Sequence, residues 1–177
     1  MRQVLLMRGI NVGASNRISM PSLRERLTEA GFGEVRTHLQ SGNVVVSSEL
    51  SPDELAAECR RHISEGFGMD IDVLARTAEE LAEVVRQDPL AAVAVDPKLY
   101  QVSFCSAEPD EELLHRLNDL AAPSERLVAV GREIYGWYPD GAGRSRLAAE
   151  LSGRRMAVTA TTRNWRTVTA LLEMARE

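Results

Sequence analysis

Strand-like and helix-like segments follow one another in the same order twice along this chain of 177 residues. Short runs rich in β-branched residues predict strands, and apolar residues three to four positions apart predict helices. The first half reads strand, helix, strand, strand, helix, strand, followed by one more helix. This order is typical of the split β-α-β arrangement of ferredoxin-like folds, and it indicates an α+β protein.

Capping signals define the helices of the first half. Ser19 precedes a predicted helix over 20–30, and the sequence Ser51-Pro52-Asp53-Glu54 forms a capping box that opens a second helix, ending near Glu65. Thr77 opens a third helix, to about Arg86. The predicted strands of this half cover residues 2–7, 34–40, 43–48 and 70–76.

The second half repeats this order without a visible repeat of residues. Strands are predicted at 99–105, 126–130, 133–138 and about 156–160, and helices at 109–120, 144–151 and 162–176. We therefore expect two ferredoxin-like halves packed together. The first half is residues 1–87 with an extra helix, 88–98 form a connection between two Asp-Pro pairs, and the second half is 99–177 with a C-terminal helix.

Composition narrows the class of protein. No apolar run approaches the roughly 18 residues of a membrane span, and the first residues are too soon interrupted to be a signal peptide. Cys59 and Cys105 are isolated, which favours buried, reduced thiols in the cytoplasm and no metal site. The net charge of −5 disfavours strong non-specific binding of nucleic acid. We expect no cofactor and no membrane partner, and the oligomeric state stays open.

The polar loop from Arg8 to Ile18 joins a predicted strand to a predicted helix. Backbone amides and the positive helix end could present donors to an anion, with Arg8, Asn11 and Gly13 as candidate ligand-binding residues. The loop is neither a Walker loop nor a dinucleotide fingerprint, because the spacings differ. The alternative is a structural loop with glycines at special dihedral angles.

Three further segments hold candidate residues. The stretch from Asp140 to Arg146 precedes a predicted helix and supplies Arg144 and Ser145, with a flexible turn as the alternative. Arg163 and Asn164 lie where the last helix is expected to begin, and we expect them to face outward. Asn43 follows the hairpin turn Ser41-Gly42, where a purely structural role is the first interpretation.

Four motifs resemble those of one known family. They are Arg8-Gly9-Ile10-Asn11-Val12-Gly13, Gln40-Ser41-Gly42-Asn43-Val44, Gly143-Arg144-Ser145 and Ala160-Thr161-Thr162-Arg163-Asn164-Trp165. In this order they resemble the bacterial domain-of-unknown-function family numbered 1697. The resemblance implies a type of fold and a set of motifs, and it implies no activity.

The loop of residues 8–18 and the three further candidate segments hold many neutral donors and arginines but a single carboxylate, Asp140. Asp140 is therefore the one candidate for a catalytic acid or base. Three hypotheses remain open at this point: binding of a phosphate-bearing or carboxylate ligand, an enzyme acting on a phosphorylated substrate, and a protein-interaction module. Tyr135 and Trp137 share one strand face, and we expect them to pack in the core or an interface rather than to stack on bases.

Overall fold

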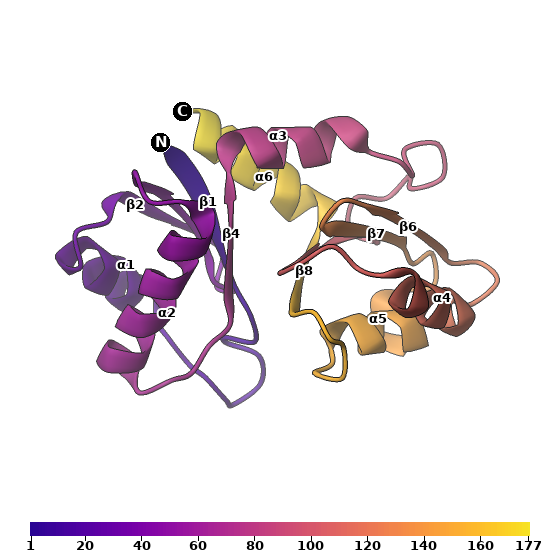
Figure 1. Ribbon diagram of the computed structural model, residues 1–177, viewed down its shortest axis with the longest axis horizontal. Coiled ribbons are helices and arrows are strands. Elements are labelled where there is room, and N and C mark those ends of the chain that lie inside the picture. Colours follow the sequence, from indigo (N-terminus) through magenta and orange to yellow (C-terminus); the bar gives the residue numbers. More distant parts are fainter. The chain divides into compact units, whose positions relative to one another are not determined.

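The computed structural model describes residues 1–177 as a mixture of helices and strands (Figure 1). The first elements are β1 (Arg2–Met7), α1 (Met20–Glu29), β2 (Gly33–His38), β3 (Asn43–Ser47), α2 (Pro52–Phe67), β4 (Val73–Thr77) and α3 (Ala78–Gln87). They are followed by β5 (Tyr100–Cys105), α4 (Glu111–Leu120), β6 (Arg126–Val130), β7 (Glu133–Trp137), the short 3-10 helix η1 (Ala142–Arg144), α5 (Arg146–Ser152), β8 (Ala160–Asn164) and α6 (Trp165–Arg176).

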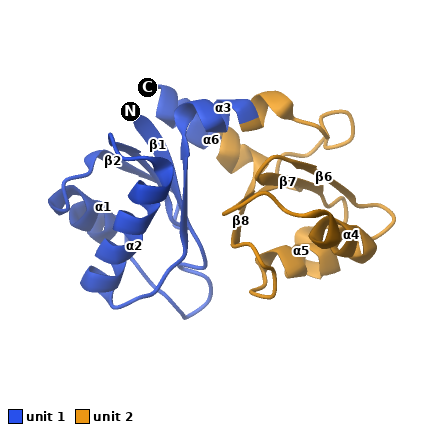
Figure 2. Cartoon of the chain, in the orientation of Figure 1, with its two compact units in different colours: residues 1–83, 170–177 blue, residues 84–169 orange.

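The chain divides into two compact units, coloured separately in Figure 2. Unit 1 is residues 1–83 together with 170–177, and unit 2 is residues 84–169. The helices α3 and α6 therefore contribute residues to both units. Arg36 of β2 contacts the carboxylate of Glu177 and the carbonyl of Met174, so the end of α6 is tied into unit 1.

Unit 1 has a four-stranded antiparallel sheet in the order β2-β3-β1-β4. The helices α1 and α2 lie side by side on one face of this sheet (Figure 1). Alternate strand residues point toward these helices, as the two-residue period of a strand requires. The core between sheet and helices contains Leu5, Met7, Val44, Val46, Leu23, Leu27, Leu55 and Ile63, all fully buried.

The predicted helix caps of unit 1 are confirmed. The Ser19 hydroxyl accepts a hydrogen bond of 3.2 Å from the Ser22 amide at the start of α1. At α2, the Ser51 amide donates to the Glu54 carboxylate while the Ser51 hydroxyl accepts from the Glu54 amide. A cap of this kind stabilises a helix by about 1 kcal/mol, which fixes where each helix begins against the sheet.

Unit 2 repeats the arrangement with the sheet order β6-β7-β5-β8. Its helices α4 and α5 enclose a second core on one face, built from Cys105, Leu113, Leu117, Ile134, Tyr138, Leu147, Leu151 and Ala160. Both sheets thus have the strand order of a ferredoxin-like fold, as the sequence pattern predicted. Cys59 and Cys105 are free and buried, also as predicted.

The last strand is not where the sequence pattern placed it. The prediction was a strand near 156–160 and a helix from Thr162, but β8 covers Ala160–Asn164 and α6 begins at Trp165. The β-branched pair Thr161-Thr162 suits a pleated ladder better than a first helical turn. Asn164 then caps α6, because its Oδ1 accepts a hydrogen bond of 2.9 Å from the Thr167 amide.

Tyr100, Tyr135 and Trp137 lie on the sheet face away from α4 and α5, because they alternate along their strands with residues of the second core. Tyr135 and Trp137 are buried there, as the prediction of core packing requires. Tyr100 stacks on Trp165 with 4.7 Å between ring centroids, and the Tyr135 hydroxyl donates to the Val84 carbonyl at 2.8 Å. These rings are therefore packing elements rather than an open platform for bases.

Candidate functional site

Asn11 holds the loop of residues 8–18 in place. Its Nδ2 donates to the carbonyls of Ile18 at 2.9 Å and Gln40 at 2.6 Å, and its Oδ1 accepts from the Ile18 amide. The backbone of Asn11 is left-handed, with φ of +54°, a conformation that asparagine tolerates better than most residues. The carboxamide therefore joins this loop to the β2–β3 turn, and both of its polar atoms make hydrogen bonds within the fold.

The other candidates of this loop are also accounted for by the fold. The Arg8 guanidinium lies 3.6 Å from the Asp72 carboxylate, and the Arg8 amide donates to the Asp72 carbonyl. Gly13 is exposed, with φ of +63°, and a side chain built on it would meet no atom. Left-handed backbone is sufficient reason for glycine at this position.

The turn after β2 is closely packed around Gly42. A methyl group on Gly42, whose φ is +78°, would lie 2.6 Å from Met7 Cβ and 2.7 Å from Ile10 Cδ1. The neighbouring Asn43 is fully buried, and its Nδ2 donates to the His38 carbonyl. The structural interpretation of this motif therefore explains both residues.

Arg163 lies on a strand and is buried, which differs from the outward position expected at a helix start. Its Nη1 donates to the Thr161 hydroxyl at 2.8 Å and to the Thr162 carbonyl at 2.9 Å. Burial lowers the pKa of the Arg163 guanidinium to about 10. The side chain is thus part of the sheet packing, because the strand alternation turns it inward at this position.

Unit 2 has a surface cleft of about 360 Å³ between the end of α4 and the segment that leads into α5. The α4 side supplies residues 119–122, and Glu125 lies at the foot of β6. The opposite wall consists of Asp140, Gly141, Arg144, Ser145 and Arg146. The predicted residues Asp140, Arg144 and Ser145 are therefore brought together, whereas Arg163 and Asn164 of the same unit do not line this cleft.

The two arginines of the cleft differ from Arg8 and Arg163, which have protein partners. Arg144 and Arg146 are exposed and make no hydrogen bond or ion pair with the protein. Ser145 between them is buried, and its hydroxyl caps α5 by accepting from the Ala148 amide at 3.1 Å. That cap fixes the backbone from which Arg144 and Arg146 project beside the cleft, and their guanidinium donors stay available.

Three carboxylates line the same cleft. Asp140 Oδ2 accepts from the Ser124 hydroxyl at 2.9 Å, and Glu125, which is buried, accepts from the Ala122 amide at 2.8 Å. Asp119 is exposed and has no protein partner. The cleft therefore offers both cationic donors and anionic acceptors within one small volume.

Glu125 also influences the core beneath the cleft. Burial raises the pKa of the Tyr138 phenol, and the negative charge of Glu125 raises it further. The Tyr138 ring lies over Gly136, where a methyl group would come within 2.6 Å of the phenol oxygen. The wall of the cleft next to Asp140 therefore rests on closely packed core residues.

Sequence reasoning missed Asp119 and Glu125 as cleft residues. Asp119 lies in the last turn of α4 and Glu125 directly precedes β6, so only the fold brings them into one cleft with Arg144. The break Ala121-Ala122-Pro123 after the helix was the available signal for a turn at this point.

No group of three or more His, Cys, Asp or Glu side chains has the arrangement needed to hold a metal ion. None of the helices has the length and apolar character required to cross a bilayer.

Comparisons with known proteins support the fold and the family. The structure is similar to that of the conserved bacterial protein SP0830 from Streptococcus pneumoniae, with a TM-score of 0.76, 23% sequence identity and 98% of each chain covered. None of the curated proteins is similar to the chain. The sequence model of a family described as protein of unknown function matches residues 1–135, which include the first two motifs, and the chain thus belongs to the family DUF1697.

Proposed function

We propose that the protein binds a small ligand that carries a phosphate or carboxylate together with hydroxyl or ammonium donors, in the cleft of unit 2. The observation that carries this proposal is that Arg144 and Arg146 both line the cleft and have no protein partner. Arginine presents a planar set of donors that suits phosphate and carboxylate oxygens.

The carboxylates of the cleft restrict the class of ligand further. An anion without hydrogen-bond donors would be attracted by the two arginines but repelled by Asp119 and Asp140. The repulsion would offset the attraction. A ligand with hydroxyl or ammonium groups can donate to the carboxylates while its acidic group lies against the guanidinium groups. Sugar phosphates, hydroxy acids and amino acids have this combination, whereas inorganic sulfate does not.

The volume of the cleft agrees with this class. About 360 Å³ lies at the lower end of the range of small-molecule sites, so it suits a ligand smaller than a dinucleotide. Anion binding by the other motif residues is not part of the proposal, because Asn11, Asn43 and Arg163 use their polar groups within the fold.

Thermal unfolding against a ligand panel tests the proposal. The panel contains phosphate, sulfate, nucleotides, sugar phosphates, hydroxy acids, dicarboxylates, amino acids and short RNA. A ligand at a hundred times its dissociation constant adds about 2.7 kcal/mol, which raises Tm by several degrees. We expect sugar phosphates, hydroxy acids or amino acids to raise Tm, and sulfate to have little effect. A panel without any shift would contradict the proposal.

An enzyme acting on a phosphorylated substrate is the second candidate, favoured by the position of Asp140 in the same cleft as Arg144. The arginines would stabilise developing negative charge, and Asp140 would move the proton. The test is turnover of whichever phosphorylated ligand raises Tm. Asp140→Asn should abolish that turnover and keep the Tm shift, and a mere binding protein would show no turnover in either form.

We also propose that the protein is bacterial and acts in the cytoplasm. The buried, free thiols of Cys59 and Cys105 support a reducing compartment. Fractionation of cells that express the chain, with detection in the soluble cytoplasmic fraction, is the test of location.

A further inference from the structure

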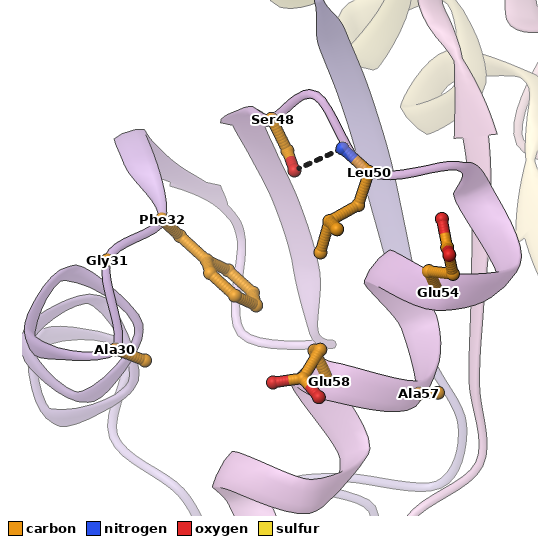
Figure 3. Close-up of a pocket in the computed structure, with 8 residues that line it drawn as sticks. All are labelled: Ala30, Gly31, Phe32, Ser48, Leu50, Glu54, Ala57 and Glu58. Carbon is orange, nitrogen blue, oxygen red and sulfur yellow. Dashed lines mark hydrogen bonds between the residues drawn. The ribbon is translucent and has the colours of Figure 1, made fainter.

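Unit 1 has a second surface cavity, a groove of about 550 Å³ next to α2 (Figure 3). Ala30 and Gly31 after α1, and Phe32 before β2, form one wall. Ser48 and Leu50 after β3 form the end, and the first turns of α2 contribute Glu54, Ala57 and Glu58. All eight lining residues belong to unit 1, so this groove is a different site from the cleft of Arg144.

The floor of the groove is apolar. The Phe32 ring points into the space between α1 and α2, and the Leu50 side chain projects toward it (Figure 3). Leu50 is 37% exposed although it is a large aliphatic residue. Its position is fixed by a hydrogen bond of 3.2 Å from its amide to the Ser48 hydroxyl, so the apolar surface is built into the turn.

The only ionisable groups that line the groove are the carboxylates of Glu54 and Glu58. Hydrogen bonds from Ser51 lower the pKa of Glu54, and a hydrogen bond from Arg61 lowers the pKa of Glu58. Both groups are therefore ionised at neutral pH. No lysine or arginine lines the groove, and Arg61, which pairs with Glu58 Oε2, lies outside it, so the lining itself is anionic.

Each carboxylate keeps one oxygen available. The protein contacts of Glu54 use Oε2, which accepts from the Ser51 amide and hydroxyl. The contacts of Glu58 with Arg61 and His62 likewise use Oε2. The Oε1 atom of each has no protein partner, so two acceptors one helical turn apart remain on the α2 wall of the groove.

We infer that this groove binds a small organic cation, a guanidinium or ammonium group joined to an aromatic or branched aliphatic body. The cationic head lies at the free oxygens of Glu54 and Glu58, and the body lies on Phe32 and Leu50. The volume is within the range of small-molecule sites, and the charge of the lining selects the sign of the ligand.

Nuclear magnetic resonance of the full chain labelled with ¹⁵N, titrated with benzamidinium, tests the inference. We expect the amide signals of Gly31, Phe32, Leu50, Ala57 and Glu58 to shift in a saturable way. Benzamide has the same body without the charge, and benzoate reverses the charge, so both should bind at least tenfold more weakly. Equal shifts with benzamide would show an apolar groove without selection for a cation and would overturn the inference.

Two variants separate charge from folding. Glu58→Gln should weaken benzamidinium binding about tenfold, while Asp53→Asn, which removes a carboxylate on α2 outside the groove, should leave it unchanged. Ala57 is exposed, so Ala57→Arg should fold and place a guanidinium group in the groove, abolishing binding. Unchanged affinity in Ala57→Arg, or binding only of a lysine-rich or arginine-rich peptide and not of benzamidinium, would contradict the inference.

Discussion

The guanidinium group of Arg163 donates a hydrogen bond of 2.8 Å to the hydroxyl of Thr161, two residues earlier on β8. This bond, with the one to the Thr162 carbonyl, separates Arg163 from the free arginines of the unit 2 cleft. Arg163 and Arg144 both belong to sequence motifs, but Arg163 is bonded within the fold and Arg144 has no protein partner. Stability measurements distinguish these two roles.

Arg163→Ala should lower the free energy of unfolding by about 2 kcal/mol, because it leaves a cavity and removes the donor to the buried Thr161 hydroxyl and the partly buried Thr162 carbonyl. Arg163→Met keeps much of the buried aliphatic volume and should recover about half of the loss. Arg144→Ala should change the free energy of unfolding by less than about 0.5 kcal/mol, since its side chain is exposed and unpartnered. Urea unfolding measures all three, and equal stability of Arg163→Ala and the parent chain would contradict a structural role.

Asn11 is expected to stabilise unit 1 through its side chain and through its backbone conformation. Asn11→Gly removes the three carboxamide hydrogen bonds but tolerates φ of +54°. Asn11→Ala removes the same bonds and adds strain of about 1 kcal/mol in the left-handed region. Thermal unfolding should therefore rank the parent chain above Asn11→Gly and Asn11→Ala last. An alanine variant as stable as the glycine variant would show that the backbone conformation relaxes.

Gly42 and Gly131 allow the effect of an added methyl group on the free energy of unfolding to be compared at two positions. Both have positive φ, but a methyl group at Gly131 meets no atom, whereas one at Gly42 lies 2.6 Å from Met7 Cβ. Gly131→Ala should lower the free energy of unfolding by about 1 kcal/mol through backbone strain alone. Gly42→Ala should lower it by at least a further 1 kcal/mol through overpacking, as measured by urea unfolding. Similar losses at both positions would mean that the turn can move away from Met7.

Cys59 should make the protein less stable at alkaline pH. Burial raises the pKa of its thiol from 9.0 to about 12. Above pH 9 the unfolded chain loses this proton while the folded protein keeps it, so the contribution is complete below pH 9 and is lost as pH rises toward 12. The limiting slope for one such group is about 1.4 kcal/mol per pH unit.

Urea unfolding of the parent chain and of Cys59→Ala between pH 8 and 10.5 checks this slope. The alanine variant is expected to be less stable at pH 8, because it leaves a small cavity, but to lose stability less steeply above pH 9. Parallel curves for the two proteins would contradict the assignment of the slope to this thiol.

The order of elements was predictable because its signals are local. Ser19 and the Ser51–Glu54 box mark helix starts through contacts within three residues, and the alternation of β-branched residues marks strands. The antiparallel ferredoxin-like order of each sheet then follows from the order of elements.

The site was less predictable, because it depends on register and on tertiary neighbours. A shift of β8 by four residues from the predicted position placed Arg163 on a strand face that is buried, and this reversed the orientation expected for it. Asp119 and Glu125 come together with Arg144 only when α4, β6 and α5 are assembled. Nor does the sequence show that the end of α6 returns to unit 1 through Arg36 and Glu177.

The most direct test of the proposed ligand site is a titration of the ¹⁵N-labelled full chain with glycerol 3-phosphate, which has a phosphate and two hydroxyl donors. We expect saturable shifts of the amide signals of residues 119–122 and 140–146, with binding weakened at least tenfold in Arg144→Ala and in Arg146→Ala. Arg154→Ala removes an exposed, unpartnered arginine outside the cleft and should leave the titration unchanged. Equal affinity in all three variants, or shifts confined to residues outside the cleft, would contradict the central claim.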